Sequence, residues 1–245
     1  MDLKGRTAIV TGAANGIGRA TALRLAQAGA RVAVLDLDKE KAERTTADIQ
    51  SLGGTALALA VDVTKPAEVQ HAVSAILAEF GKIDILVNSA GAGWHRQEFF
   101  HDLPIGSWQW ILDLNINGTL NVVNAVIEHM IANQYGRIIN VGSIAAKVGI
   151  PKLAVYAASK GAIVSFTKSL AMELGPHNIT VNCVSPGMVS ASEETPPCDG
   201  TFLGRKSAPS EQAAVIVFLA SDEASFVTGA DYLVDGGRTL GPRGA

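Results

Sequence analysis

Short apolar runs alternate with longer amphipathic stretches along the whole chain. The apolar runs, such as those at 7–10 and 32–35, are rich in β-branched residues, which is typical of strands buried on both faces of a parallel sheet. The longer stretches have the period of amphipathic helices, with long helices expected near 106–133 and 152–175. Strands are expected near 6–11, 31–36, 55–61, 83–88, 136–142, 178–184 and 231–235. This alternation predicts a single α/β domain over 1–245, doubly wound, with a mainly parallel seven-stranded sheet and helices on both faces.

One segment interrupts this rhythm. Residues 188–207 contain Pro196, Pro197, Gly200 and Gly204 and have neither helical nor strand periodicity. They follow the sixth expected strand, so they belong at the carboxyl edge of the sheet, where open α/β sheets bind their ligands. We therefore expect this segment to border a ligand site.

A glycine-rich loop follows the first expected strand and precedes a helix. Gly12, Gly16 and Gly18 allow a tight turn and a close approach to a pyrophosphate, while the helix N-terminus offers unpaired N–H groups. About twenty residues further on, the second strand ends at Asp36, whose carboxylate suits a ribose hydroxyl. Alone, the glycines are compatible with plain turns and Asp36 with a solvated acid, but together they favour a dinucleotide site.

A second group of residues is suited to acid–base chemistry. Tyr156 and Lys160 are four positions apart, so on a helix both side chains leave the same face. A nearby ammonium lowers the pKa of a tyrosine hydroxyl, and the hydroxyl of the upstream Ser143 is suited to hold a substrate oxygen. Each residue alone is more often structural, but together they indicate proton transfer on an alcohol oxygen.

The order and spacing of these motifs resemble the short-chain dehydrogenase/reductase superfamily over nearly the whole chain. The shared features are the Thr-Gly-x-x-x-Gly-x-Gly loop from Thr11, Asp62-Val63, Asn88-Ser89-Ala90-Gly91, Asn115, Ser143, Tyr156 with Lys160, Pro186-Gly187 and Asp235-Gly236-Gly237. The resemblance implies a Rossmann fold, hydride transfer with a nicotinamide cofactor, and a substrate lid at 188–207.

The resemblance also assigns roles to individual residues. It implies that Tyr156 is the general acid/base, that Lys160 lowers its pKa and holds the nicotinamide ribose, and that Ser143 orients the substrate oxygen. It implies that Asn115 kinks its helix and supports a proton path to solvent. The cofactor contacts that it implies are Gly12, Asn15, Gly16, Ile17, Gly18, Asp36, Asp62, Val63, Asn88, Ala90, Gly91, Tyr156, Lys160, Pro186, Gly187 and Val189.

The residues around the glycine loop favour NAD over NADP. Asp36 repels a 2′-phosphate, and the following Leu37 offers no cation to bind one. Asn15 stands where NADP-dependent members of the family often have a base. Arg19 is a nearby cation, which we expect to cap local structure or to pair on the surface.

Two positions depart from the family pattern. Ser89 stands where the family more often has a second asparagine. Ala191 stands where the family often has a threonine that binds the nicotinamide carboxamide, with Ser190 and Ser192 on either side. Either serine replaces that contact or the contact is lost, and the acid–base residues are unaffected.

Composition argues against several other classes of protein. The net charge is −3 with no basic stripe, which argues against nucleic-acid binding, and no apolar run is long enough to cross a bilayer. The five histidines are dispersed without metal-ligand spacing, so we expect no metal site. Cys183 and Cys198 form no CxxC motif, and the N-terminus has no apolar signal segment, so we expect a reduced, cytoplasmic protein.

The sequence therefore predicts an NAD-dependent oxidoreductase acting on a secondary alcohol or ketone. Two alternatives on related folds stay open, a catalytically silent NAD-binding regulator and a methyltransferase-like protein. The complete set of Asn115, Ser143, Tyr156 and Lys160 argues against both. Ser143 does not fit a hydrolase nucleophile, because it lies in no Gly-x-Ser-x-Gly motif and no histidine stands at a triad-like position.

Two features bear on partners. The two long helices are apolar around much of their surface and the family commonly pairs them about a two-fold axis, so we expect a homotetramer or homodimer. The apolar residues include Leu120, Val123, Ile127, Ile163, Phe166 and Leu170. Bases near the expected mouth, Arg96, Lys147 and Lys152, are compatible with a cyclic or acyl-chain hydroxy substrate that bears an acid, or with solvated surface charges.

Overall fold

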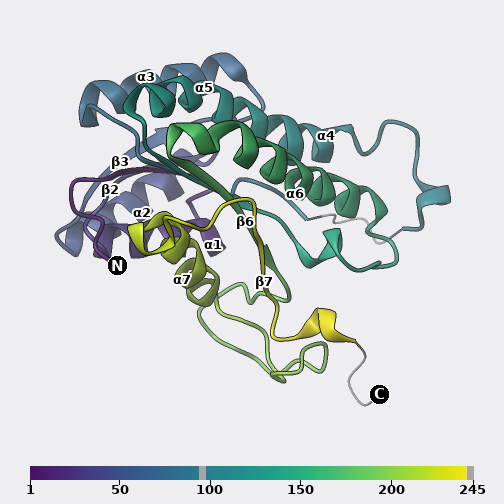
Figure 1. Cartoon of the computed structure of the whole chain (residues 1–245). Coiled ribbons are helices and arrows are strands. Elements are labelled where there is room, and N and C mark those ends of the chain that lie inside the picture. The colour runs from purple at the N-terminus through teal and green to yellow at the C-terminus, as the bar shows by residue number, and fades with distance from the viewer. Residues whose placement is uncertain (94–97, 242–245) are drawn as a thin grey trace.

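A seven-stranded parallel sheet forms the centre of the computed structural model, which describes residues 1–93 and 98–241 (Figure 1). The strand order is β3-β2-β1-β4-β5-β6-β7, and neighbouring strands run parallel. The strands are β1 (Thr7–Thr11), β2 (Arg31–Asp36), β3 (Thr55–Ala60), β4 (Ile85–Asn88), β5 (Gly136–Val141), β6 (Ile179–Pro186) and β7 (Asp231–Val234). This confirms the doubly wound α/β fold expected from the sequence.

Helices cover both faces of the sheet (Figure 1). One layer is formed by α1 (Gly16–Gln27), α2 (Lys39–Ser51) and α7 (Pro209–Ala220), and the other by α3 (Pro66–Phe80), α5 (Gly118–Asn133) and α6 (Ala154–Leu174). Successive strand residues point to opposite faces, so Ile9 joins the core under the second layer and Val10 the core under the first. Because both faces are covered, the strands β1, β4 and β6 are buried at every position rather than at alternate ones.

The long helix expected near 106–133 is not one regular helix. It starts as α4 (Gln109–Leu112), widens into a π-turn at Asp113–Asn117 and continues as α5. A π-turn inserts one residue into the helical hydrogen-bond pattern and is frequent at functional sites. Asn115 lies inside it, so the irregularity that the family resemblance implied at this residue takes the form of a π-turn.

Most apolar residues of the two long helices pack within the monomer. Val123, Ile163 and Leu170 are buried, and the other three residues singled out in the sequence are partly buried. The surplus of apolar surface is therefore smaller than expected, because these side chains pack on the sheet and on neighbouring helices. Within residues 1–93 and 98–241, every helix lacks either the length or the apolar character needed to cross a bilayer.

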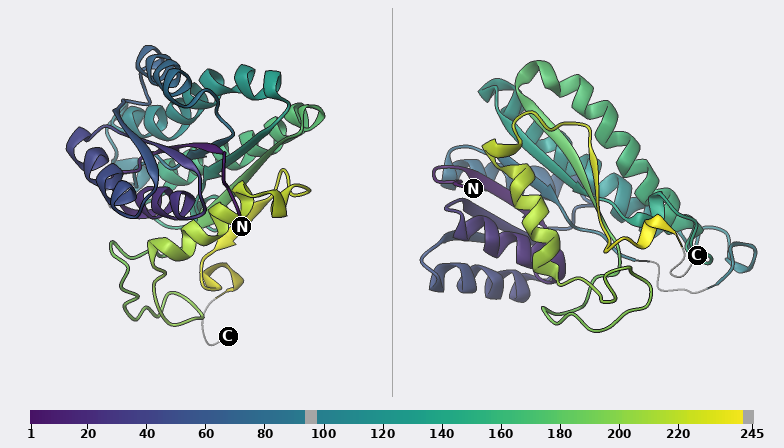
Figure 2. Two further views of the ribbon diagram at one scale, coloured as in Figure 1. Left: turned by 90° about the vertical axis from the view of Figure 1, so that its left-hand side faces the viewer. Right: turned by 60° about the horizontal axis from the view of Figure 1, so that its bottom comes forward.

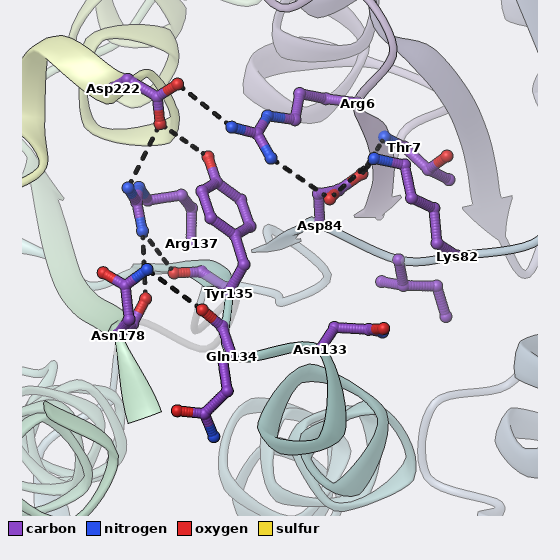
Figure 3. Close-up of polar contacts among 12 residues, drawn as sticks. Arg6, Thr7, Lys82, Asp84, Asn133, Gln134, Tyr135, Arg137, Asn178 and Asp222 are labelled. Carbon is purple, nitrogen blue, oxygen red and sulfur yellow. Dashed lines mark hydrogen bonds and ion pairs between the residues drawn. The ribbon is translucent and has the colours of Figure 1, made fainter. Parts of the chain in front are cut away.

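A cluster of charged residues closes the amino edge of the sheet (Figure 3). The guanidinium carbons of Arg6 and Arg137 lie 3.7 and 4.3 Å from the ring centroid of Tyr135. Asp222 accepts hydrogen bonds from Arg6 at 3.1 Å, Tyr135 at 2.9 Å and Arg137 at 3.3 Å. Arg6 also lies 3.5 Å from Asp84. We call these five residues the amino-edge cluster; it ties the starts of β1, β4 and β5 to the turn after α7.

The segment 188–207 is irregular, as its prolines and glycines predicted. Two isolated bridges hold it, one between Val189 and Ser207 and the other between Pro197 and Arg205. Figure 2 shows it as an excursion that leaves the sheet after β6 and returns at the start of α7. It therefore borders the carboxyl edge, where the cleft described below opens.

Candidate active site

A cleft of about 490 Å³ opens at the carboxyl edge of the sheet, next to the point between β1 and β4 where the strand order reverses. Most of the residues expected to contact a dinucleotide line it: Gly12, Asn15, Ile17, Gly18, Asp36, Asp62, Val63, Ala90, Gly91, Tyr156, Lys160, Pro186, Gly187 and Val189. Ser143 lines it too, whereas Gly16, Asn88 and Asn115 are not among the residues that line it.

The glycine loop leaves the N-terminus of α1 open toward an anion. Gly12 has a φ of +62°, and a Cβ at this position would lie 2.8 Å from Ala90 Cα, so only glycine fits. Asn15 makes no side-chain cap, and the first turn of α1, which lies wholly in the described part of the chain, contains no acid. The unpaired N–H groups and the positive end of the helix dipole therefore suit the diphosphate of a dinucleotide.

Asp36 is held beside this loop by two backbone amides. Its Oδ2 accepts a hydrogen bond from Ala14 N and its Oδ1 one from Asp38 N, each at 3.0 Å. A carboxylate oxygen has further acceptor capacity, which is available to ribose hydroxyls. Arg19 is bound elsewhere, because its Nη2 pairs with Asp48 Oδ2 at 2.7 Å. The expected surface pairing of Arg19 is thus confirmed.

Asp62 and Val63 form the wall of the cleft beyond β3. Asp62 Oδ1 accepts hydrogen bonds from Thr64 Oγ1 at 2.7 Å and Thr64 N at 2.9 Å, and these bonds keep the pKa of the carboxyl below its usual value. Val63 packs so closely on Gly118 that a Cβ there would lie 2.7 Å from the valine methyl. The wall is therefore fixed to the start of α5.

Hydrogen bonds from the neighbouring strands fix the end of β4 and the loop that follows it. Asn88 Nδ2 donates to Asn140 Oδ1 at 2.9 Å, in the neighbouring strand. Thr11 Oγ1 accepts hydrogen bonds from the backbone of Ser89 at 3.1 Å and of Ala90 at 3.0 Å. This threonine, which ends β1, thus fixes the loop at the position where the family more often has a second asparagine.

Ser143 and Tyr156 interact on the opposite wall. Ser143 follows β5, and its Oγ accepts a hydrogen bond from Ala145 N at 3.1 Å. Burial raises the pKa of Tyr156 above its usual value, and a hydrogen bond with Ser143 partly offsets that rise. Lys160 is not among the causes of this shift, and its Nζ is directed at the Val141 carbonyl.

Lys160 lies one helical turn after Tyr156 on α6, as their spacing predicted, and it is buried. Its Nζ donates a hydrogen bond to Val141 O at 2.9 Å. Burial lowers the pKa of Lys160 to about 8, and Cys183 acts in the opposite direction. Gly91 passes close by, since a Cβ there would lie 3.3 Å from the Lys160 Nζ. The ammonium therefore lies directly under the cleft.

Asn115 is anchored in the π-turn by its amide group. Ala92 N donates to its Oδ1 at 3.0 Å, and its Nδ2 donates to Ala92 O at 3.2 Å and to Ser159 Oγ at 3.0 Å. Ser159 in turn donates to Tyr156 O at 2.7 Å. Sequence reasoning missed Ser159, whose only local signal is its place between Tyr156 and Lys160 on the buried side of α6.

The cleft ends at Pro186 and Gly187, where β6 leads into the lid. Ser190 Oγ and Ser192 Oγ each accept a backbone N–H two residues further on, at 3.4 and 3.3 Å. Neither serine lines the cleft. The hydroxyl groups of both serines are therefore engaged with the backbone of the lid rather than exposed in the cleft.

The bases expected at the mouth have other partners. Lys147 Nζ lies 3.1 Å from Asp231 Oδ2, and Lys152 Nζ lies 5.1 Å from the ring centroid of Phe99. Arg96 falls in 94–97, outside the described residues. The two lysines therefore lend no support to a mouth that attracts an acid, because one is neutralised and the other rests on an aromatic face.

Known proteins resemble this chain over the residues that build the cleft. A family model described as short chain dehydrogenase matches residues 6–196. The short-chain reductase protein NovJ of Streptomyces niveus is 40% identical, covering 94% of this chain and 93% of its own. D-threitol dehydrogenase of Mycolicibacterium smegmatis is also 40% identical, covering 97% of this chain and 94% of its own.

A solved structure extends the likeness to three dimensions. Carveol dehydrogenase from Mycobacterium avium, crystallised in complex with NAD, superposes with a TM-score of 0.91 at 28% identity. The superposition covers 98% of this chain and 99% of that one. The chain is thus similar to these proteins over almost its whole length, from the glycine loop to β7.

Proposed function

Because the chain belongs to the short-chain dehydrogenase family of oxidoreductases, we propose that it transfers a hydride between NAD(H) and a secondary alcohol or its ketone. One observation carries the proposal: Ser143, Tyr156 and Lys160 line the same cleft as the glycine loop and Asp36. Bound NAD⁺ supplies the hydride acceptor in this chemistry, while the protein positions the reactants and moves the proton. The names of D-threitol dehydrogenase and carveol dehydrogenase support an alcohol as substrate.

Each residue of the wall has a distinct role in this proposal. Tyr156 removes the proton of the substrate hydroxyl as a general base and returns it in the reverse direction as a general acid. Ser143 binds the substrate oxygen and the phenol by hydrogen bonds. Lys160 holds the cofactor ribose, and its charge favours the phenolate. Asn115 supports exchange of the proton with solvent from behind the cleft.

The pKa of Tyr156 must fall when cofactor binds if it is to act near neutral pH. In the protein alone, burial raises this pKa. A cation beside a phenol favours the phenolate, so we expect NAD⁺ to lower the pKa. Ultraviolet difference spectra of the phenolate, recorded against pH with and without NAD⁺, measure the shift. A pKa that does not change on binding would contradict the role of Tyr156 as base.

The proposed cofactor is NAD rather than NADP. Asp36 is fixed at the loop by two amides, and Arg19 is engaged by Asp48, so the position of a 2′-phosphate carries net negative charge. Such a mismatch is worth a few kcal/mol, or at least about tenfold in kcat/KM. Asp36→Ala should reduce the preference for NAD. Equal kcat/KM for both cofactors in the natural protein would refute this choice.

The direct test of the function is NADH absorbance after mixing protein, NAD and a panel of secondary alcohols. Tyr156→Phe keeps the ring and removes the proton carrier, so turnover should fall by about 10²-fold or more while NAD affinity is kept. Binding of NAD without turnover of any alcohol or ketone would instead favour the silent regulator. Near-normal turnover in Tyr156→Phe would contradict the assignment of the acid/base.

The proposed enzyme is a homotetramer or homodimer in the cytoplasm. The apolar residues Met172 in α6 and Phe226 after α7 are 82% and 103% exposed, and a partner chain would cover such surface. Light scattering at micromolar concentration measures the assembly. A stable monomer would reject it.

A further inference from the structure

An ion pair ties the turn after Ser143 to the edge strand β7. Lys147 Nζ lies 3.1 Å from Asp231 Oδ2, and the Asp231 side chain is 5% exposed while that of Lys147 is 35% exposed. The two residues are far apart in the sequence, and no local motif predicts their meeting. A buried carboxylate is unfavourable unless it is paired and hydrogen-bonded, so Asp231 depends on its neighbours.

A hydrogen bond from β6 fixes the Asp231 carboxylate. Its Oδ1 accepts a hydrogen bond from Ser185 Oγ at 2.6 Å, and Ser185 is fully buried. Its Oδ2 accepts no hydrogen bond from any described residue, so the Lys147 ammonium acts as an ion-pair partner rather than as an aligned donor. Within the described part of the chain, loss of the Lys147 charge would leave this oxygen uncompensated.

Lys147 ends a tight turn that begins at Ser143. Ala145 N donates to Ser143 Oγ at 3.1 Å, and Ala146 N donates to Ser143 O at 3.0 Å. Lys147 N then donates to Ile144 O at 2.8 Å. Residues 143–147 thus form one hydrogen-bonded unit, so a constraint on Lys147 is transmitted to the serine through a few short bonds.

We propose that Lys147 and Asp231 are a positioning pair that holds the 143–147 turn against β7 and thereby directs the Ser143 hydroxyl at the substrate oxygen. The inference rests on the proposed function, in which Ser143 binds that oxygen. Neither residue of the pair lines the cleft, so both act through Ser143 rather than on the substrate. Small displacements of a positioning group reduce turnover more than they reduce binding.

The pair has a clear rival interpretation. Lys147 would instead attract an acidic substrate at the mouth, as the sequence first suggested. The two roles differ in what they change: a positioning residue affects kcat for every substrate, whereas an anion-binding lysine affects KM for acids only. Substrates matched in shape, one with a carboxylate and one with an amide in its place, therefore separate the two.

The experiment compares three single variants of the protein and the double variant Lys147→Met/Asp231→Asn. Lys147→Met keeps the length of the side chain and removes its charge, Asp231→Asn keeps the hydrogen bond to Ser185, and Lys147→Arg keeps the charge. Lys168→Met, which removes an exposed lysine from α6, is the matched control. For each protein we would measure kcat and KM with the matched substrates, NAD affinity by fluorescence, and Tm.

We expect Lys147→Met and Asp231→Asn each to lower kcat by about tenfold with both substrates, with KM and NAD affinity within about twofold. Lys147→Arg should retain most of kcat, and the double variant should be no worse than either single one, because the two residues act as a unit. An unchanged kcat in Lys147→Met, or a KM that rises for the acid alone, would overturn the proposal.

A second measurement tests the positioning pair without relying on the proposed enzymatic activity. Hydrogen exchange reports on the amides of Ala145, Ala146 and Lys147 without any substrate. We expect faster exchange at these amides in Lys147→Met than in the natural protein and in Lys168→Met. Unaltered exchange contradicts the positioning pair even if the wild-type protein turns over no alcohol, and such a lack of turnover would count against the proposed function alone.

Discussion

The two edges of the sheet hold buried charge in different ways. At the amino edge, Arg137 is 2% exposed and its guanidinium bonds to Asp222 and to backbone carbonyls. At the carboxyl edge, Lys160 is 7% exposed, and among the described residues its hydrogen-bond partner is the Val141 carbonyl, which carries no charge. Charge at the first edge is neutralised by a carboxylate, whereas the charge of Lys160 has a neutral carbonyl as its partner among the described residues, which is the pattern expected where burial serves a function.

The largest expected effect comes from replacing the functional charge. Lys160→Met should lower kcat/KM for NAD by about 10³-fold or more, because it removes both the charge that favours the phenolate and the proposed ribose contact. The same change should raise the Tm of the cofactor-free protein, since it replaces a poorly compensated ammonium with an apolar side chain. Steady-state kinetics and thermal melts test both parts. A lower Tm would mean that the bond to Val141 outweighs desolvation.

Stability should depend on pH through the same lysine. Burial lowers its pKa from 10.5 to about 8, so between these values the unfolded chain binds more protons than the folded one. Unfolding free energy should therefore rise with pH across this window, by on the order of 3 kcal/mol in total. Below the lower end of the window Lys160 is protonated in both states, and its burial destabilises the fold by the full amount. Denaturant melts of the natural protein and of Lys160→Met across the window give the difference. Parallel curves for the two proteins would contradict the pKa shift.

At the amino edge, removal of a buried charge should lower stability and leave turnover unchanged. Arg137→Met removes a buried guanidinium whose partner Asp222 is 62% exposed and can be rehydrated, so we expect a loss of about 2 kcal/mol and a Tm lower by about 5 °C. Turnover per folded molecule should be unchanged. A Tm equal to or above that of the natural protein would show that the guanidinium costs as much as its bonds contribute.

The smallest effect is expected from Tyr135→Phe. Burial raises the pKa of Tyr135 to about 12, so its hydroxyl is protonated at neutral pH and donates to Asp222. The variant loses this one bond and keeps the ring between Arg6 and Arg137, so unfolding free energy should fall by about 1 kcal/mol or less. Denaturant melts of the variant and the natural protein measure this loss, and kcat should be unchanged. A much larger loss would indicate that the hydroxyl orders the whole cluster.

The strands were predictable because local composition determines them. The continuous apolar runs, as in β1 and β2, are explained by helices on both faces, and the parallel order follows from the alternation of elements. The amino-edge cluster was not predictable, since Arg6, Tyr135 and Asp222 are brought together by the topology alone. A kink at Asn115 was expected from the family resemblance, but its form as a π-turn was not, because residues Asp113–Asn117 carry no helix-breaking glycine or proline.

The site was predictable as a set of residues but not as an electrostatic environment. The spacing of Tyr156 and Lys160 gave their common helical face. It did not give the burial that raises the pKa of the tyrosine and lowers that of the lysine. Nor did it give the partner of Lys147, which lies on a strand much later in the chain. Burial and long-range pairing are properties of the packed molecule, and local sequence does not encode them.

The π-turn has a consequence for how this chain tolerates change in length. One residue more than an α-helix needs is present between α4 and α5, so deleting a single residue there would leave an unbroken α-helix. Such a deletion would close the widened turn and leave α4 and α5 facing as they do now, because the turn itself absorbs the extra residue. The helix would survive, yet Asn115 would lose the widened turn from which its amide reaches Ala92 and Ser159. In descendants of this gene, insertions and deletions should therefore be excluded from this stretch even though its secondary structure could absorb them.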